Sequence, residues 1–416
     1  MPSVYYAVCP GTGGTDDKKT GSPTITIASG VATLSVAQTG NIGQGFRITY
    51  DTSKVCFISK VNSSTSFNVV TATGGTPSNE ASAVTVNSIR ADYASLSAAE
   101  AGASDSAHLN TSNLTTGSHI LNLVCYAGAS ADTTTITFSG YTTGASYYIN
   151  VYAPSGGTQS ISNNRHLGAW STSYYRLDVT SNDAIYTDQG YLRFNGLQIK
   201  ANTATYWCLH TYAHYSECDI RIDNCIGTGN SNTARGFLWA DAEVVTCKNC
   251  IAYDFNGQDW GAFVSSGGST DGLLTLYNCT VYDVTGRGIR VYGGTGYGRI
   301  TAINCVVTDT GDDFSGTFTS SNYNASEDST APGASSITGI AAAGTFVAAS
   351  SGNFSLVSGS PLIGEGTDLS AYFTTDIAGT TRSTWDIGAF EYVASGGGGV
   401  SIIPIIMNHL QKMRAN

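Results

Sequence analysis

The chain has 416 residues and a net charge of −11, and only 12% of its residues are charged. This acidic balance excludes a nucleic-acid partner, because phosphate binding needs a basic stripe that the sequence lacks. No apolar run reaches the roughly 18 residues that a membrane-spanning helix needs. The opening residues have neither the basic nor the apolar region of a secretory signal peptide, so we expect none.

The N-terminal third predicts three elements before any repeat begins. Residues 1–20 form an opening strand and a polar loop, and residues 21–89 form a small β module of short strands broken by glycine and asparagine turns. Residues 94–101 are the best helix candidate. We expect this helix to cover the open end of the next domain, residues 90–393, where an exposed strand edge would favour aggregation.

An asparagine followed by a cysteine recurs four times in that domain, at intervals of 25, 29 and 26 residues. Each pair follows alternating apolar residues, which indicates a solenoid whose coils are built from short strands. At roughly 25 residues per coil, residues 90–393 have room for about ten to twelve coils. The pairs are Asn224 and Cys225, Asn249 and Cys250, Asn278 and Cys279, and Asn304 and Cys305.

Stacking explains why these two residue types return. Asparagine tolerates a left-handed backbone and can bond the asparagine above and below it, so we expect a ladder at one corner. Cysteine beside it is a small buried hydrophobe. Because packing accounts for the cysteines, we predict reduced thiols.

These repeats resemble those of right-handed parallel β-helix proteins of the pectate-lyase-like superfamily, in which an asparagine ladder occupies one corner. Residues 352–392 are similar to the closing segment of many such proteins, including the phrase Asp386-Ile387-Gly388-Ala389-Phe390-Glu391. The resemblance covers roughly residues 90–393 and the first 20 residues. It implies an all-β fold, a right-handed single-stranded parallel β-helix with an inserted N-terminal β module and a short C-terminal tail. This fold hosts lyases, hydrolases, adhesins and phage spikes alike, so it does not fix the activity.

For lyase chemistry the resemblance implies an arginine or lysine base, with calcium held by carboxylates. The candidates that flank the regular coils are Asp254, Asp283, Arg287 and Arg290. Hydrolysis would need two carboxylates that straddle the bond, for which Asp241 with Glu243, or Asp312 with Asp313, are adjacent candidates. None of these residues forms a specific motif, and loop aspartates often cap turns, so the sequence assigns no catalytic residue.

Four possible metal ligands lie close together, Cys208, His210, His214 and Cys218, and in an extended chain they would share one face. Their spacing matches no compact zinc motif, and aromatic residues surround them. We therefore expect an aromatic surface or corner there, no metal and no cofactor. Calcium belongs only to the lyase alternative.

Residues 394–416 predict a flexible glycine linker and a short apolar tail that ends in basic residues. A frayed terminus is one interpretation. The other is a tethered docking peptide, because its apolar side chains would be a liability unless a partner buried them. These side chains are Ile402, Ile403, Ile405, Ile406, Met407 and Leu410.

Two functions remain open at this point. In the first, the chain is a non-catalytic structural or glycan-binding protein of a virion surface, similar to phage tail spikes, fibres or decoration proteins. Its partners would then be host glycans and, through the tail, other virion or surface-assembly proteins, and its location would be the virion surface or the extracellular space. In the second, it is a polysaccharide lyase or glycoside hydrolase that acts on acidic glycans. A homotrimer is compatible with either.

Overall fold

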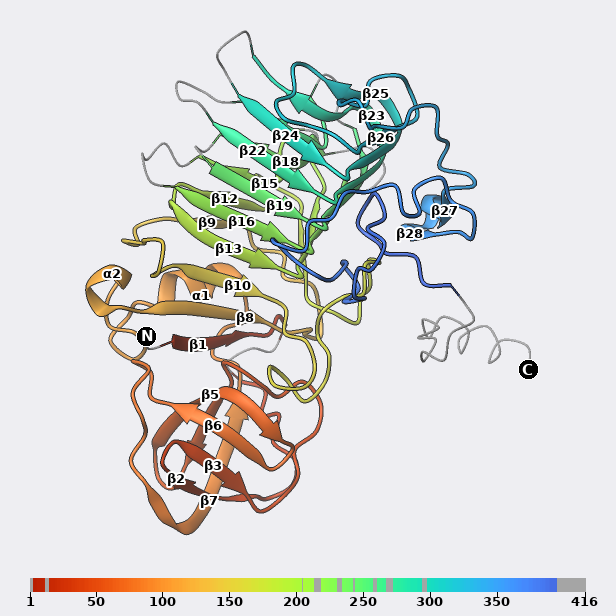
Figure 1. Ribbon diagram of the computed structural model, residues 1–416. Helices are drawn as coiled ribbons and strands as arrows, with labels where there is room; N and C mark the ends of the chain where they lie inside the picture. The colour runs from red at the N-terminus through yellow and green to blue at the C-terminus, as the bar shows by residue number, and fades with distance from the viewer. Residues whose placement is uncertain are drawn as a thin grey trace.

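The computed structural model describes residues 3–11, 15–203, 205–212, 218–229, 234–241, 244–256, 260–266, 272–293 and 298–394. Parallel strands of successive coils stack into a solenoid, and a small barrel lies at its N-terminal end (Figure 1). The fold is a parallel β-helix with an inserted β module, as the sequence predicts.

One long side of the solenoid is an eight-stranded parallel sheet. Its alternating residues point inward, which explains the period-2 apolar pattern of the repeats. In stacking order its strands are β1 (Ser3–Val8), β8 (Ile120–Cys125), β10 (Ile149–Tyr152), β13 (Tyr191–Asn195), β16 (Asp219–Asp223), β19 (Val244–Lys248), β22 (Leu273–Tyr277) and β24 (Arg299–Ile303).

The other strands of the coils form two parallel rows that β23 joins into one twelve-stranded sheet. The first row directly follows the asparagine–cysteine corner and contains β11 (Arg176–Val179), β14 (Gln198–Ala201), β17 (Ile226–Thr228) and β20 (Ile251–Phe255). The second row contains β9 (Ile136–Phe138), β12 (Ile185–Thr187), β15 (Trp207–Thr211), β18 (Gly236–Ala240) and β21 (Phe263–Ser265). The strands β23 (Thr280–Val291) and β25 (Val306–Ser315) run through both rows, and β26 (Ala325–Ser326) pairs with β25.

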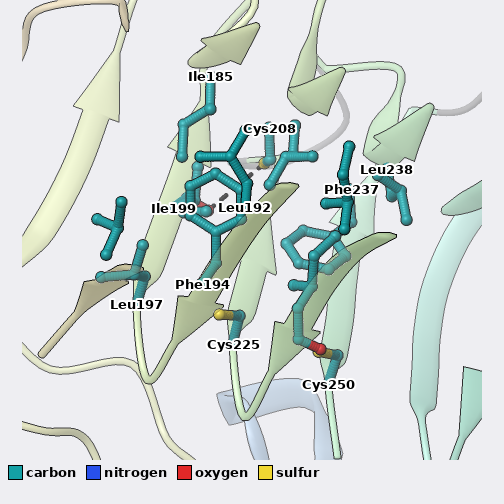
Figure 2. Close-up of a cluster of buried hydrophobic side chains, with 14 of the residues drawn as sticks. Ile185, Leu192, Phe194, Leu197, Ile199, Cys208, Cys225, Phe237, Leu238 and Cys250 are labelled. Carbon is teal, nitrogen blue, oxygen red and sulfur yellow. Dashed lines mark hydrogen bonds between the residues drawn. The ribbon is translucent and has the colours of Figure 1, made fainter. Parts of the chain in front are cut away.

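The interior of the coils is filled by columns of apolar side chains in register. One column of the second row runs through Ile185, Leu209, Leu238 and Phe263, all completely buried. Figure 2 shows such residues meeting in the centre of the coil with Cys225 and Cys250. All ten cysteines are buried and unpaired, and the redox state of their thiols stays a prediction.

The module between β1 and β8 is a closed antiparallel barrel with its own apolar core. Its strands are β2 (Thr24–Ala28), β3 (Val31–Leu34), β4 (Arg47–Tyr50), β5 (Lys54–Ser63), β6 (Ser66–Val70) and β7 (Glu80–Arg90). Outward side chains of β8 and β10, including Tyr152, complete that core, so barrel and solenoid pack directly on each other.

Two short helices follow the barrel, α1 (Leu96–Gly102) and α2 (Leu114–Gly117). The side chain of Ser95 caps α1 by accepting a hydrogen bond from the Ala98 amide. Leu96 and Ala99 of α1 enter the core of the solenoid, where the helix packs against β1, β8 and β9. No helix among the described residues is long and apolar enough to cross a membrane.

The asparagines of the repeats stack at the corner between the two sheets, each with a left-handed backbone at φ from 51 to 57°. We call this feature the asparagine corner; its members are Asn224, Asn249, Asn278 and Asn304, together with Asn195, which lies one position earlier in the register and lacks the left-handed backbone. Neighbouring carboxamides are 3.0 to 3.2 Å apart in three of the four steps. Between Asn249 and Asn278 the expected ladder is interrupted, because the buried Arg382 donates from Nη2 to Asn249 Oδ1 at 2.9 Å.

The coils end at β26, so the expectation of ten to twelve coils is wrong: the first sheet has eight strands. Residues 327–394 add only the antiparallel pair β27 (Phe346–Ala348) and β28 (Asn353–Leu356) and a 3-10 turn, η1 (Ala349–Ser351). The estimate failed because it divided the whole domain by the repeat length. The C-terminal part instead returns along the outside of the coils (Figure 1).

This closing segment (residues 352–392) covers the asparagine corner through main-chain hydrogen bonds. Asn249 donates to the carbonyl of Thr375, and Asn304 to that of Thr367, both at 2.9 Å. Asn278 donates to two carbonyls of the closing phrase, Asp386 at 2.8 Å and Gly388 at 3.0 Å. The corner is therefore a seam that holds the C-terminal part of the chain.

The acidic residues of the closing phrase hold that seam in shape. Asp386 accepts hydrogen bonds from the amides of Gly364 and Tyr392. Glu391 accepts from the amides of Ser383 and Thr384. It also pairs with Arg382 at 3.4 Å, in a site where both side chains are almost fully buried.

Candidate functional site

Aromatic side chains line the outer face of the second row of strands. The outward position of each strand directly follows the inward one, which places Tyr186, His210 and Trp239 in one column. We call the surface that they form with their neighbours the aromatic strip; its members are Tyr186, His210, Tyr212, Trp239, Trp260 and Tyr292.

The ring centroids follow one another without a gap. They are 5.1 Å apart from Tyr186 to His210 and 6.3 Å from His210 to Trp239. They are 5.1 Å apart from Trp239 to Trp260 and 5.0 Å from Trp260 to Tyr292. The centroid distances from Tyr186 through His210 and Trp239 to Tyr292 limit the strip to about 17 Å between its end rings, which is enough for a short oligosaccharide.

Trp239 is the centre of the strip. Its ring also lies 5.3 Å from Trp207 and 5.5 Å from Tyr292. Tyr212 and Tyr292 are exposed, whereas Trp239 and Trp260 are half-buried, so the rings form a packed surface that is partly accessible to a ligand. Fixed aromatic rings can bind an apolar face of a ligand with little loss of conformational entropy.

Cations and a carboxylate border the rings. The guanidinium of Arg235 lies 4.8 Å from the ring centroid of Trp260, and that of Arg290 lies 4.8 Å from the centroid of Tyr292. At the other end Asp183 bonds the Nδ1 of His210 at 2.8 Å and accepts from the Trp207 amide at 2.7 Å. These polar groups could hydrogen-bond the hydroxyls of a ligand that stacks on the rings.

The strip opens into a shallow cavity of about 260 Å³ at its N-terminal end. Asp183 and Tyr186 line it together with Thr137, Asn182 and Tyr206. The hydroxyl, carboxamide and carboxylate groups of this cavity extend the hydrogen-bonding surface beyond the last ring.

The structure divides the four catalytic candidates between two places. Asp254 and Asp283 lie at the bend between the two rows, where Asp309 continues their column, all three with a left-handed backbone. Arg287 lies 3.5 Å from the carboxylate of Asp312, and Arg290 belongs to the border of the aromatic strip.

The aspartate column resembles the asparagine corner in backbone geometry but carries charge. Burial, followed by the charges of Asp309 and Asp254, raises the pKa of Asp283. Repulsion between stacked carboxylates has this sign because protonation relieves it. Among the described residues, no group of three or more histidine, cysteine or acidic side chains has the geometry to hold a metal ion.

The adjacent carboxylates considered for hydrolysis have different roles. Asp313 is buried, and its Oδ2 accepts hydrogen bonds from the amides of Glu327 and Asp328. Burial, partly offset by these bonds, raises its pKa to about 6. Asp312 is paired with Arg287, so these two neighbours do not face a common site.

The possible zinc ligands do not share a face. Cys208 is completely buried and directs its thiol at the carbonyls of Ile199 and Thr228, whereas His210 lies on the outer surface beside Asp183. The parity argument failed because burial does not alternate strictly along β15: Trp207, Cys208 and Leu209 are all buried, and His210 is the first residue on the outer face. His214 lies outside the described residues.

Sequence reasoning expected an aromatic surface around His210 but missed the contributions of Tyr186, Trp239, Trp260 and Tyr292. All four lie one or more coils away from His210 along the stacking direction, so sequence proximity does not reveal them. A signal existed: the residue after each inward position of the second row points outward. Reading that position down the repeats gives Tyr186, His210, Trp239, Val264 and Arg290.

No protein-family model matches the chain, and no curated protein does. Among solved structures, the crystal structure of pectate lyase Pel9A is similar to it over 78% of this chain and 96% of that chain, with 18% identity and a TM-score of 0.32. The stacked coils themselves define the class of protein: this chain is a parallel β-helix protein.

Proposed function

We propose that this protein is a non-catalytic, glycan-binding β-helix of a phage virion, such as a tail spike, fibre or decoration protein, and that the aromatic strip is its binding surface. The continuous run of rings from Tyr186 to Tyr292 is the observation that carries this proposal. Sugars present apolar C–H faces and a rim of hydroxyls. Rings bordered by arginine, aspartate and tyrosine offer the complementary chemistry.

The rigid scaffold favours binding of an extended chain. Every ring of the strip stands on a strand or on the turn beside one, and each strand is fixed by the coils above and below it. The ligand therefore meets a preorganised surface, so it loses less affinity to the ordering of side chains.

The ten buried free thiols support a virion origin. Unpaired cysteines are typical of proteins that fold in a reducing compartment, and a virion protein folds in the cytoplasm of its host. The tail, residues 395–416, lies outside the described residues, and its docking role stays a proposal. Deleting it should leave the solenoid folded but abolish its incorporation into particles; unchanged incorporation would refute the docking role.

An array of immobilised neutral and acidic oligosaccharides tests the glycan proposal. We expect saturable binding by the full chain, and a loss of about tenfold or more in affinity for Trp239→Ala, which corresponds to about 1.4 kcal/mol. The matched control is Tyr372→Ala, which removes an exposed ring stacked on Tyr277 in the closing segment. Equal losses in both variants, or no binding to any glycan, would refute the proposal.

A polysaccharide lyase or hydrolase that acts on acidic glycans is the alternative function. The raised pKa of Asp283 in the aspartate column favours it, because carboxyls whose pKa is raised by burial and by neighbouring carboxylates are candidates for general acids. Incubation with acidic polysaccharides, with and without calcium, separates the two functions. If the protein cleaves a polysaccharide and Asp283→Asn or Arg287→Gln abolishes this cleavage, the protein is an enzyme and the non-catalytic proposal is overturned.

A further inference from the structure

A second cavity, of about 310 Å³, is lined by residues of the barrel module, of β1, β8, β10 and β13, and of the loop after β10. Gln44 of the barrel and Gln159 of the loop after β10 close it from one side. The first sheet and the start of the asparagine corner form the other side. The aromatic strip belongs to the second row of strands, so the two surfaces are built from different elements.

The wall of this cavity is almost entirely polar. Of its ten lining residues only Ala153 has an apolar side chain, and five are carboxamides. Two carboxamides are fully occupied. Gln44 donates to the carbonyl of Ser59 and accepts from the Tyr152 hydroxyl, and Asn122 donates to the carbonyl of Val4 and accepts from Asn150. The remaining three carboxamides each keep one group unpaired.

The asparagine corner decides which group of Asn195 faces the cavity. Asn249 must present its NH₂ to the Thr375 carbonyl, since a carbonyl can only accept. Asn224 therefore accepts from Asn249 and donates to Asn195 Oδ1 at 3.0 Å. The NH₂ of Asn195 is left without a partner among the described residues. The contact of Asn249 with the closing segment therefore determines that Asn195 presents its NH₂ group, and not its carbonyl, to the cavity.

The other two carboxamides are oriented by the same logic. Gln159 Oε1 accepts from the Ser155 amide at 2.9 Å, and an amide can only donate, so the NH₂ of Gln159 is free. The NH₂ of Asn122 donates to the carbonyl of Val4, so Asn122 presents its side-chain oxygen to Asn150. Asn150 therefore donates its NH₂ to Asn122 at 2.9 Å, and the side-chain carbonyl of Asn150 is free.

Arg165 supplies a charge to this set. Its side chain is largely buried, and its Nη2 donates to the Ile377 carbonyl at 3.0 Å. Its Nε is buried without a hydrogen-bond partner, and the carboxylates of Asp376 and Asp223 act on it without forming a direct ion pair. Burial outweighs these charges and lowers the pKa of Arg165, so an anion in the cavity that it lines would stabilise the guanidinium charge.

We propose that this cavity binds one acidic sugar residue, with its carboxylate facing Arg165 and the free NH₂ groups of Asn195 and Gln159. Three N–H donors suit a carboxylate, and the one free acceptor, the Asn150 carbonyl, suits a neighbouring hydroxyl. The volume lies at the low end of ligand sites, so the ligand is a single sugar unit. This site is independent of the aromatic strip.

Calorimetric titration of the full chain with sodium glucuronate tests the site, and glucose serves as the neutral comparison. We expect saturable glucuronate binding at least tenfold tighter than that of glucose. A second titration, with methyl β-glucuronide, identifies where the ligand comes from. An affinity equal to that for glucuronate indicates a terminal residue of a glycan, and a weaker affinity indicates the free sugar acid. Glucuronate binding no tighter than glucose binding would overturn the proposal.

The decisive variant is Gln159→Glu. It keeps the oxygen that accepts from Ser155 and replaces the free NH₂ by a second carboxylate oxygen, which repels the ligand. Asn79→Asp is the matched control, because Asn79 is exposed on the barrel and also accepts a backbone amide hydrogen, from Ser29. We expect at least tenfold weaker glucuronate binding in Gln159→Glu and none of this loss in Asn79→Asp or Trp239→Ala. Unchanged binding in Gln159→Glu would overturn the proposal.

Discussion

The asparagine corner and the aromatic strip are both built from stacked side chains, but they differ in how far the rest of the chain covers them. The asparagine corner is covered by the closing segment, and Asn249, Asn278 and Asn304 are buried. None of the described residues covers the exposed members of the aromatic strip in this way, and Tyr212 is 46% exposed. The corner uses its stacked groups to bind the chain's own backbone, whereas the strip keeps its rings available to a ligand.

The same difference explains why the asparagine corner is visible as a sequence repeat and the aromatic strip is not. Residues of the corner recur because every coil must turn there and must bond the same segment. Residues of the strip vary from one coil to the next, as expected for a surface selected for a ligand of defined shape. In this molecule, regular repetition marks stability and irregular aromatic residues mark the candidate site.

The largest expected effect falls on the covered side. Arg382→Leu should destabilise the protein by about 3 kcal/mol or more, because it leaves the buried Glu391 without its counter-ion. Denaturant unfolding followed by fluorescence measures this loss. The control, Arg221→Leu, removes an exposed pair with Asp219 and should cost about 1 kcal/mol or less. Similar losses in both variants would show that the seam contributes little.

A smaller loss is expected at the next position of the corner. Asn278→Ala removes three buried hydrogen bonds, two to the carbonyls of Asp386 and Gly388 and one from Asn304, and leaves Arg382 as the remaining donor to both carbonyls. We expect a cost of about 2 kcal/mol in the free energy of unfolding. Asn62→Ala removes an exposed carboxamide bond to Asn68 and should change stability by about 0.5 kcal/mol at most. Hydrogen exchange of residues 352–392 should speed up in the first variant alone.

At the junction between the solenoid and the barrel, His108 should make the stability of the protein depend on pH. Burial alone would lower the pKa of His108, but its hydrogen bonds to Asp92 and Asp105 outweigh burial and raise it. A raised pKa in the folded protein means that the stabilisation is complete below the unfolded value of about 6.5 and is lost as pH rises through the folded value.

Thermal unfolding between about pH 6 and pH 9 measures this contribution. The wild-type midpoint should fall as pH rises above about 6.5, by less than the losses at the corner. His108→Gln should remove that fall. If His108→Gln keeps the full decrease of the unfolding midpoint with pH, other titratable groups cause this decrease.

The smallest effect on stability is expected on the open side. Tyr212→Ser and Tyr292→Ser should each change the free energy of unfolding by about 0.5 kcal/mol or less, because both rings are exposed. The same variants should weaken glycan binding. A large stability loss without a change in binding would make the strip a structural feature.

The architecture was predictable because stacking repeats the same physical demand in every coil. Asn224, Asn249, Asn278 and Asn304 share one backbone geometry, and their spacing is visible in the sequence. The interruption at Arg382 was not predictable, because it depends on where a distant segment returns. The closing phrase could be recognised as a motif, but its contacts with Asn278 could not.

The candidate sites were less predictable for a related reason. Trp239 and Tyr292 are far apart in the chain, and only the stacking register brings their rings to 5.5 Å. The cavity beside Arg165 combines the barrel, the first coils and a loop, so no local pattern announces it. Asp254 and Asp283 could be singled out from the sequence, but not the fact that they stack in a column with Asp309.

The most direct test of the central claim is a crystal structure of the full chain with the oligosaccharide that binds it most tightly. We predict that successive sugar rings lie along the aromatic strip, with one ring stacked on Trp239 and others near Trp260 and Tyr292. A glycan bound elsewhere, with the rings of the strip uncontacted, would contradict the account.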